Sequence, residues 1–304
     1  MHVAAVVVTY NRLSLLQRLV ERLREVDPAT GLTEILVVDN ASTDGTGAWL
    51  AAQSDLVSQT LATNSGGAGG FDVGLAWAME RGADLAWMMD DDGVPAPDCL
   101  TRLLEHEDLD FWGPAVLAEG DPGRLCFPIR LPGGTRVVHA MSEVEAAARD
   151  VDGPGLIPGV VIPFNGVLVT RALVERIGTP RAEFFIWGDD VEYLWRAERA
   201  GARIATVVDA HFAHPATDDL GTPMMFGRTT YNHTPSDLKH YCMARNNTLN
   251  LRDYRGWLFV LMFWVKTLWF YLVTHREPRR VALSARAAYA GLRGDFSGHR
   301  RYLR

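Results

Sequence analysis

Runs of aliphatic residues alternate with amphipathic segments along the first part of the chain. The runs at 3–8 and 85–89, and the one within 34–40, are typical of strands that are covered on both faces of a sheet. Between the run at 3–8 and the run within 34–40, leucine and valine recur at helical spacing from 13 to 23. Strands that alternate with helices in this way form right-handed crossovers in a parallel sheet. The expected fold class is therefore α/β, with a mostly parallel sheet flanked by helices.

The other expected elements follow less regular patterns. A short segment near 57–61 takes the third strand position. Further helices are expected at about 72–81, 97–107, 171–177 and 193–199, and further strands at 111–116, 160–169 and 203–208. The stretch 119–152 is rich in turn-forming residues and has no clear period, so no element is predicted there.

The most apolar segment of the chain lies near its carboxyl end, at 257–273, and contains three tryptophans. It is slightly shorter than the about 20 residues that span a bilayer, and tryptophan favours the membrane interface. Arginines follow it at positions 276, 279, 280, 286, 293, 300, 301 and 304. A helix lying in a membrane surface is therefore expected, within a helical region at 216–304 appended to a domain at 1–215. A helix in an oligomer interface and a spanning helix are the alternatives.

Three consecutive carboxylates, Asp90, Asp91 and Asp92, follow the strand at 85–89. The carboxyl ends of parallel strands are where open α/β sheets bind ligands. Adjacent carboxylates repel each other unless a cation or hydrogen-bond donors neutralise them. The triplet therefore indicates either a solvated acidic turn or a divalent-cation site. Because alternate residues of an extended chain face opposite ways, Asp91 is expected to point away from its two neighbours.

Four glycines lie within the segment 66–70, directly after Asn64 and Ser65. Such a loop can approach a phosphate closely at a helix N-terminus, although a flexible turn is the commoner meaning of clustered glycines. The segment does not match a Walker A motif, and it follows the third strand rather than the first. These two features exclude a P-loop and a nicotinamide site.

A second acidic cluster, Asp189, Asp190 and Glu192, opens a predicted helix. Carboxylates are favourable at a helix N-terminus, so capping is one interpretation and a catalytic base is the other. Downstream, His211 and His214 lie three residues apart near the end of a strand. In a chain that also carries an acidic triplet, this pair indicates metal ligation as strongly as a structural role.

Composition narrows the classes of function. The 304-residue chain is 48% hydrophobic and has a formal net charge of −7, so it can bury a full core and is not expected to bind nucleic acid. Its three cysteines lack the spacing of a disulfide framework or a metal site. No basic region precedes the first strand, so no signal peptide is expected.

Parallel strands bring these loops to one edge of the sheet. There, carboxylate oxygens, phosphate oxygens and water could hold a hard divalent cation, and an imidazole would make Mn²⁺ as suitable as Mg²⁺. A carboxylate beside a metal-held diphosphate could deprotonate an acceptor hydroxyl. The pattern therefore predicts transfer of a group from a nucleoside diphosphate to a hydroxyl.

The motifs at 7–12, 37–44 and 64–67, together with the acidic triplet, resemble glycosyltransferase family 2, the inverting enzymes of the GT-A fold. The sequences at 66–71, 90–93, 127–130, 164–166, 188–192, 214–215 and 241–246 are similar to those of the actinobacterial galactofuranosyltransferases that initiate cell-wall galactan. The resemblance spans about residues 3–250. It implies UDP-galactofuranose as the donor and a rhamnose-terminated, polyprenyl-diphosphate-linked acceptor.

The resemblance also implies roles for single residues. Asp190 would be the catalytic base, with Asp189 as the alternative. The metal, Mn²⁺ or Mg²⁺, would be held by Asp90, Asp92 and His214. The donor would be bound by Thr9, Asp39 (through the uracil), Asn64, Gly66, Gly67, Asp90, Arg245 and Asn246, and the acceptor by Trp187 and Glu192.

The donor sugar is not encoded in any motif that can be interpreted physically. A rhamnosyltransferase or another hexosyltransferase of the same fold therefore stays open, and so does a non-catalytic membrane-bound scaffold. The expected location is the cytoplasmic face of the cell membrane, with peripheral attachment. Homo-oligomerisation is left open.

Overall fold

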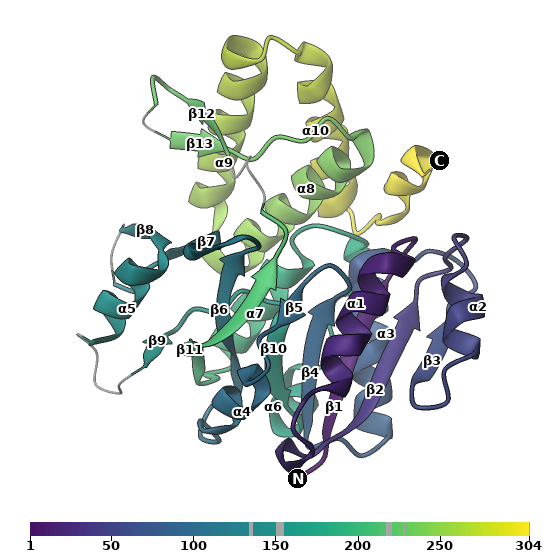
Figure 1. Ribbon diagram of the computed structural model, residues 1–304. Helices are drawn as coiled ribbons and strands as arrows, with labels where there is room; N and C mark the ends of the chain where they lie inside the picture. The colour runs from purple at the N-terminus through teal and green to yellow at the C-terminus, as the bar shows by residue number, and fades with distance from the viewer. Residues whose placement is uncertain (134–135, 150–154, 217–220, 228, 304) are drawn as a thin grey trace.

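A mixed sheet runs through the centre of the computed structural model, which describes residues 1–133, 136–149, 155–216, 221–227 and 229–303 (Figure 1). In spatial order its main row consists of β3 (Val57–Thr60), β2 (Leu32–Asp39), β1 (Val3–Thr9), β4 (Leu85–Asp90), β10 (Asn165–Thr170), β6 (Phe111–Ala118), β11 (Ile204–His214) and β5 (Val94–Pro95). Strands β1 to β4 are mutually parallel, as are β6 and β11, whereas β10 runs antiparallel between β4 and β6. The predicted mostly parallel sheet is therefore confirmed, although β10 near its middle and the two-residue β5 at its edge run in the opposite direction.

Helices cover both faces of this sheet (Figure 1). One face carries α1 (Leu13–Arg24), α2 (Thr46–Ala51) and α4 (Cys99–Leu104), and the other carries α3 (Gly66–Glu80), α6 (Arg171–Ile177) and α7 (Asp189–Arg199). Alternate residues of β1 enter two different hydrophobic cores: Val7 packs with the first set of helices, and Val6 and Val8 pack with the second. Both faces of the strand are buried, which explains its uninterrupted aliphatic run.

The glycine-rich segment is helical rather than a loop, because α3 begins at Gly66 and not near residue 72 as expected. Its glycines allow the helix to lie directly against β1. A Cβ atom on Gly74 would stand 2.5 Å from Cγ1 of Val6, and one on Gly70 would overlap the side chain of Val8. Helix propensity disfavours glycine by about 1 kcal/mol per residue relative to alanine, and packing against the sheet overrides that local preference.

Several other elements differ from their expected bounds. Helix α7 starts at Asp189, so the acidic pair lies inside its first turn. Strand β11 continues to His214, well past the expected end at residue 208. Strand β10 begins only at Asn165, since the nearby Pro163 has no N–H to donate to a strand ladder. Helix α4 is confined to Cys99–Leu104.

Because β10 is antiparallel to its neighbours, the chain takes a longer path to the second acidic cluster. This strand starts at the same sheet edge as the acidic triplet, because Asn165 pairs with Met89. The chain then crosses to the opposite edge, where α6 begins, and returns through residues 178–188 to α7. Asp189 and Asp190 therefore lie at a helix N-terminus, as expected, although the loop that leads to it follows a helix and not a strand.

The stretch in which no element is predicted folds beside β6. Its described residues, with those just after it, form β7 (Asp121–Arg130), β8 (Val137–Ala140), α5 (Met141–Arg149) and β9 (Leu156–Pro158). They bury a small core around Val138, Val144 and Ile157. Strands as short as β8 and β9 give too few alternating positions for a period to be recognised.

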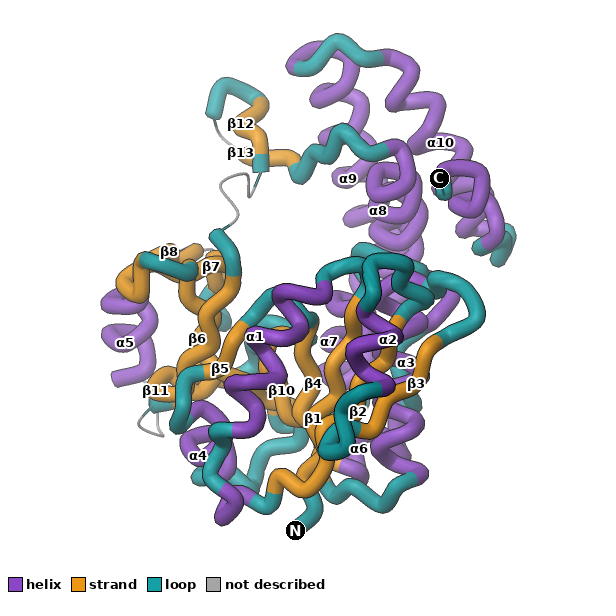
Figure 2. Tube along the Cα trace, turned by 45° about the vertical axis from the view of Figure 1, so that its right-hand side comes forward, coloured by secondary structure: helices purple, strands orange, loops and turns teal. Residues whose placement is uncertain are grey.

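A helical region stands over the carboxyl edge of the sheet (Figure 2). It contains the hairpin β12 (Thr222–Met224) and β13 (Thr229–Tyr231), the helices α8 (Asp237–Asn250), α9 (Trp257–Trp269) and α10 (Pro278–Leu292), the π-helical turns η3 (Leu251–Arg255) and η4 (Phe270–Thr274), and the 3-10 turn η5 (Ser297–Tyr302). The continuous stretch Trp257–Thr274 is long and apolar enough to cross a membrane, with a mean hydropathy of 1.6, and 22% of it is buried. Arg304, the last of the arginines that were expected to contact lipid headgroups, lies outside the described residues.

Candidate active site

The acidic triplet begins at the last residue of β4, and its members turn in different directions. Asp91 is only 3% exposed and accepts a hydrogen bond from Oγ1 of Thr9 at 2.6 Å. Asp92 reaches toward β11, where its Oδ1 lies 3.3 Å from Nε2 of His214. Two of the three predicted metal ligands, Asp92 and His214, are therefore adjacent, while Asp91 faces β1.

Arg12, in the turn between β1 and α1, joins two members of the triplet. Its Nη1 donates to Oδ2 of Asp92 at 2.6 Å and to Oδ1 of Asp91 at 3.2 Å. The Arg12 side chain is 49% exposed, so it lies at the opening of the site. A positive charge at this distance stabilises the ionised form of both carboxyl groups.

The three carboxyl groups differ in pKa. Burial raises the pKa of Asp90 well above its usual range, and the charges of its two neighbours raise it further. Burial also raises the pKa of Asp91. Burial acts in the same direction on Asp92, but His214 and Arg12 outweigh it and lower the pKa of that carboxyl group. The site therefore combines one firmly ionised carboxylate with two whose ionised forms an added cation would stabilise.

The pair formed by Asp92 and His214 fits a divalent cation. Nδ1 of His214 lies 2.9 Å from the carbonyl oxygen of Pro215 and donates to it, which leaves Nε2 directed toward Asp92; metal-binding histidines are oriented in this way. Oδ1 of Asp92 is buried without a well-aligned donor. Within the described part of the chain, no three His, Cys, Asp or Glu side chains gather as a ready-made metal cluster, so Asp90 does not complete a trio. Mg²⁺ sites commonly have one or two carboxylate ligands and are completed by substrate phosphates and water.

Two buried residues at the end of β2, Asp39 and Asn40, form hydrogen bonds that hold the neighbouring loops in place. Asp39, the predicted uracil ligand, is fully buried, and its oxygens accept from the N–H of Ser42 (2.9 Å) and from Oγ1 of Thr60 (3.2 Å). Asn40 donates to the carbonyl oxygen of Gly66 at 2.7 Å. A base that binds Asp39 would have to reach a buried carboxylate whose two oxygens each already accept one internal hydrogen bond.

The N-terminus of α3 is closed by groups of the protein itself. Oδ1 of Asn64 accepts from the N–H of Gly66 (2.8 Å), and the carbonyl oxygen of Phe185 accepts from the N–H of Ala68 (3.1 Å). A Cβ atom on Gly66, which has a φ of 73°, would overlap that Phe185 carbonyl, whereas a Cβ atom on Gly67 would meet nothing within 4 Å. Of the two glycines predicted to bind the donor, Gly67 therefore faces open space and Gly66 is packed against the loop before α7.

The second acidic cluster lies within electrostatic reach of the first. Burial raises the pKa of both Asp189 and Asp190, and the charge of Asp190 raises that of Asp189 further. The charge of Asp189 in turn contributes to the raised pKa of Asp90. Asp189 is buried and Asp190 is partly exposed, so Asp190 is the member of the pair that a hydroxyl arriving from solvent reaches first.

The loop before α7 has an unusual backbone conformation. Phe185, Trp187 and Gly188 have φ values of 67°, 70° and 89°, in the left-handed region. For a residue other than glycine this conformation costs on the order of 1–3 kcal/mol, and it persists only where the surroundings fix it. Such strain directly before the two acidic residues is typical of a functional site.

Buried side chains of α8 hold this loop. Nη2 of Arg245 donates to the carbonyl oxygen of Phe184 (2.8 Å), Nδ2 of Asn246 donates to that of Trp187 (2.7 Å), and Nδ2 of Asn250 donates to the next carbonyl (2.7 Å). Arg245 and Asn246 are 0% exposed. Both side chains face inward and position the loop, and their predicted contact with the donor diphosphate stays a prediction.

Comparison with known proteins places this arrangement in a family. Residues 4–111 match the model for Glycosyl transferase family 2. The sequence is 33% identical to galactofuranosyltransferase GlfT1 of Mycobacterium tuberculosis over 97% of this chain and 96% of the relative. The chain belongs to glycosyltransferase family 2. This glycosyltransferase is also 31% identical to GlfT1 of Mycolicibacterium smegmatis, over 90% of the chain and 91% of the relative. It is 40% identical to the undecaprenyl-phosphate mannosyltransferase of Micrococcus luteus, over 68% of the chain and 82% of the relative.

Solved structures share the GT-A-like fold of this glycosyltransferase. S. aureus TarS superimposes with a TM-score of 0.56 at 18% identity, over 84% of this chain and 40% of that one. GalNAc-T7 with UDP, GalNAc and Mn²⁺ superimposes with a TM-score of 0.57 at 13% identity, over 83% of this chain and 48% of that one. The glycosyltransferase therefore spans less than half of either chain, and these likenesses establish the fold alone.

The two residues predicted to bind the acceptor lie in different environments. Glu192 is 1% exposed, and its carboxylate accepts from Nη2 of Arg196 (2.8 Å) and from the hydroxyl of Tyr254 (2.6 Å). Both of its oxygens are bonded in the interior, and its contact with the acceptor stays a prediction. Trp187 is partly exposed beside the core of the helical region, and its contact with the acceptor stays a prediction.

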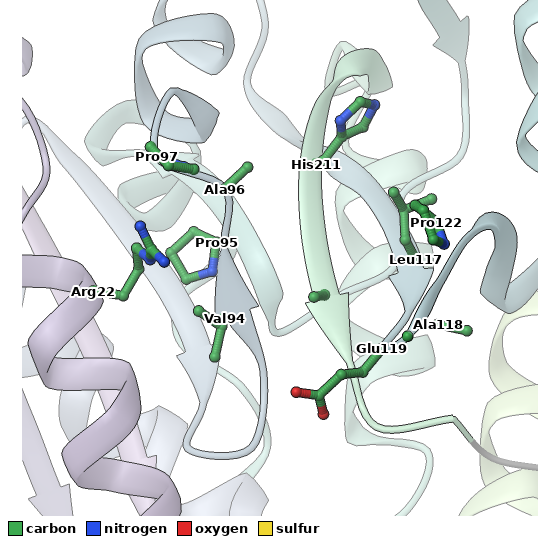
Figure 3. Close-up of a pocket in the computed structure, with 12 residues that line it drawn as sticks. Arg22, Val94, Pro95, Ala96, Pro97, Leu117, Ala118, Glu119, Pro122 and His211 are labelled. Atoms are coloured by element: carbon green, nitrogen blue, oxygen red, sulfur yellow. The ribbon is translucent and has the colours of Figure 1, made fainter.

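A cavity of about 290 Å³ opens beside the catalytic site of the glycosyltransferase, between β5, β11 and the turn after β6 (Figure 3). Arg22, Glu119 and His211 are the charged or titratable residues of its lining. The acidic residues described above do not line this cavity. His211 therefore belongs to this cavity, whereas His214 faces Asp92.

Sequence reasoning assigned no role to Arg12, Asn40 or Asn250 of this glycosyltransferase. Asn40 directly follows β2 and Arg12 lies three residues after the end of β1, so their position near strand ends was an available signal. Asn250 gave no such signal, because it bonds to a carbonyl that is 62 residues away in the sequence.

Proposed function

We propose that this glycosyltransferase moves galactofuranose from UDP-galactofuranose to a rhamnose-terminated acceptor linked to polyprenyl diphosphate. The observation that carries the proposal is the 33% identity to galactofuranosyltransferase GlfT1 over 97% of the chain. The name of the M. luteus relative refers to undecaprenyl phosphate, which agrees with a lipid-linked substrate. The two facing acidic clusters supply the chemistry that such a transfer needs.

In this proposal the two clusters have different roles. Asp92 and His214 would hold Mn²⁺ or Mg²⁺, which would neutralise the charge that develops on the departing UDP. Arg12, beside Asp92, adds a positive charge at the same place. Asp190 removes the proton of the acceptor hydroxyl, because a raised pKa suits a general base better than that of an ordinary carboxylate. Attack opposite the leaving group inverts the anomeric centre through an oxocarbenium-like transition state.

The outer surface of α9 and η4 is apolar, as expected for a protein whose acceptor carries a lipid. Exposed apolar side chains cover its outer face at Trp257, Leu258, Phe259, Leu261, Met262, Val265, Leu268, Leu272 and Val273. Contiguous apolar surface of this kind marks a contact with a protein or a membrane. Exposed arginines follow at 276, 279, 293, 300 and 301 and suit anionic headgroups. We infer that the enzyme binds peripherally to the cytoplasmic face of the cell membrane.

This helix lies on the membrane rather than across it. Its inner face is joined to polar side chains of the protein: the hydroxyls of Tyr231 and Thr267 are 3.0 Å apart, and the hydroxyl of Tyr271 lies 3.0 Å from Nδ1 of His240. A spanning orientation would carry these groups into hydrocarbon, at a cost of several kcal/mol for each group that lost its partner. An apolar outer face above a polar, attached inner face is typical of an interfacial helix.

The proposal is tested by a donor screen with purified protein. UDP-galactofuranose, UDP-galactopyranose, UDP-glucose and dTDP-rhamnose are offered with a rhamnose-terminated lipid acceptor in Mn²⁺, Mg²⁺ or EDTA. The linkage of the product is analysed, and Asp190→Asn serves as the inactive background. We expect turnover with UDP-galactofuranose that EDTA abolishes.

Each other outcome of the screen has a defined meaning. Turnover with dTDP-rhamnose alone would identify a rhamnosyltransferase. Full activity in EDTA would contradict the metal assignment. UDP binding without turnover on any donor would favour a non-catalytic scaffold.

A further inference from the structure

The C-terminal segment 296–299 packs against the loop that leads into the catalytic acids. Figure 1 shows the yellow C-terminal end lying beside the carboxyl edge of the sheet. The ring of His299 stacks on that of Phe185, with 4.4 Å between centroids and 27° between planes, and Phe296 stacks on Phe184 at 5.9 Å. Two consecutive loop residues therefore each have an aromatic partner from a segment more than 100 residues away.

A second set of contacts runs through Arg245. Its Nη1 donates to the carbonyl oxygen of Phe296 at 3.0 Å, and its Nη2 donates to that of Phe184 at 2.8 Å. The same Phe296 carbonyl accepts from Nδ1 of His299 at 2.7 Å, which holds the imidazole against Phe185. One guanidinium therefore ties the C-terminal segment and the loop together.

These contacts are buried inside the fold. Arg245 is 0% exposed and His299 is 8% exposed. Gly298 permits the close approach, because a Cβ atom there would overlap the hydroxyl of Tyr241. Burial lowers the pKa of His299, although the bond to the Phe296 carbonyl opposes this effect. The imidazole is therefore neutral at physiological pH and adds no second charge beside Arg245.

Phe185 is the residue through which this packing reaches both halves of the site. Its backbone is held at φ 67° and ψ −64°. Its carbonyl oxygen accepts from the N–H of Ala68 at the start of α3, on the donor side. Asp189 follows four residues later, at the start of α7. Since a strained residue keeps its conformation only when its neighbours fix it, loss of the stacked imidazole would release both elements together.

We propose that Phe296 and His299 are positioning residues for sugar transfer. They hold Phe185 and Arg245 so that the acidic pair at the start of α7 keeps its orientation toward the donor. The catalytic part of this inference rests on the proposed function, whereas the positioning of the loop stands on the contacts alone. The two parts are therefore tested separately.

Loop positioning is measured by hydrogen–deuterium exchange at residues 183–188 in the full-length protein without substrates. We expect His299→Ala to raise exchange there by about tenfold and His299→Phe, which keeps the stacked ring, to restore most of the protection. Tyr302→Ala is the matched control: it truncates a ring of the same 3-10 turn that packs on Tyr241 of α8, at 5.4 Å, and not on the loop. Unchanged exchange in His299→Ala would overturn the proposal.

The catalytic role is measured by steady-state kinetics on the same variants. A displacement of about 1 Å in an active site can cost on the order of 100-fold in rate, so we expect kcat to fall about 10- to 100-fold in His299→Ala. KM for the donor and the Kd of UDP should rise less than kcat falls, because the donor side is reached through the backbone bond from Ala68 to Phe185 and keeps its other contacts. Raised exchange with unchanged kcat would overturn the catalytic role. A wild-type protein that transfers no sugar would instead overturn the proposed function, and the exchange data would still decide loop positioning.

Discussion

Asp189 and Asp190 stand side by side in the first turn of α7, and burial raises the pKa of both. The proposed base must be ionised to accept a proton, so transfer should accelerate as the pH rises through a pKa above the ordinary carboxyl range. We expect Asp190→Asn to lower kcat by about 10²- to 10⁴-fold while the Kd of UDP, measured by calorimetry, stays the same. If Asp190→Asn kept its activity and Asp189→Asn lost it, the base would be Asp189.

The buried carboxyl of Asp189 should also weaken folding at neutral pH. Its pKa is higher in the folded than in the unfolded chain. At a pH below the pKa of the unfolded chain, Asp189 is protonated in both the folded and the unfolded chain, so it does not change the free energy of unfolding. As the pH rises toward the pKa of the folded chain, Asp189 ionises more readily in the unfolded chain, and the folded state loses stability. We expect Asp189→Asn to raise Tm at pH 7 but not at pH 4. Asp108→Asn, at a carboxylate that is 71% exposed, is the control and should change Tm at neither pH.

Arg12 should take the place of a cation when none is bound. It bridges Asp91 and Asp92, and hydrogen bonds to charged groups contribute about 1.5–3 kcal/mol. We expect Arg12→Ala to lower Tm by a few degrees in EDTA and Mn²⁺ to restore most of the loss, as followed by thermal melting. Arg81→Ala, which breaks a pair with Glu34 near the start of β2, should show no such dependence on Mn²⁺. An equal effect of Mn²⁺ on both variants would contradict the bridging role.

At the residue scale, local charge patterns in the sequence located the acidic side chains. Contacts between residues far apart in the sequence could not be predicted in this way. The triplet and the pair Asp189 and Asp190 could be located, because adjacent carboxylates at element ends are visible in a short window. Arg245 and Glu192 could not be assigned from such a window, since their partners lie about 60 residues away. Both make internal contacts in the structure, and their predicted contacts with substrate stay predictions.

At the scale of elements, the glycines of α3 divide into those that pack and those that do not. A Cβ atom on Gly74 would lie 2.5 Å from the side chain of Val6, whereas Gly67 has open space. We expect Gly74→Ala to destabilise the protein by about 1–3 kcal/mol through overpacking. Gly67→Ala should leave stability unchanged or raise it by up to about 1 kcal/mol, but should weaken UDP-sugar binding. Urea unfolding and calorimetry measure the two effects, and equal stability losses would refute the distinction.

The same helix shows where prediction of elements from sequence reaches its limit. Periodicity located β1, α1 and β4 correctly, because each buries whole faces and carries a regular apolar pattern. It failed at the start of α3, where tight packing against β1 overrides the local preference of glycine. It also could not foresee that β10 runs antiparallel, since strand direction depends on where the chain turns and not on the composition of the strand.

At the scale of the whole molecule, the carboxyl edge of the sheet is followed by the helical region (Figures 1 and 2), whose helix α9 carries the exposed apolar side chains. This order suits an acceptor whose sugar must reach the acidic clusters while its lipid stays in the bilayer. The Phe184–Gly188 loop is held by α8, and α8 packs closely with α10 and η5. The region that would touch the membrane is therefore also the region that holds the catalytic loop.

This double role decides how membrane binding should be tested. A truncation before Trp257 would also remove η5 and disturb the loop, so substitutions on the outer face of α9 are the cleaner change. Each buried leucine contributes about 1.5–3 kcal/mol of transfer free energy, so Leu258→Ser with Leu261→Ser should weaken co-sedimentation with anionic liposomes by tenfold or more. Val137→Ser on β8, which is also exposed, is the control and should bind as the wild type does. Equal sedimentation of the double variant would refute the membrane contact, and loss of a dimer in gel filtration instead would show that α9 covers a second copy of the chain.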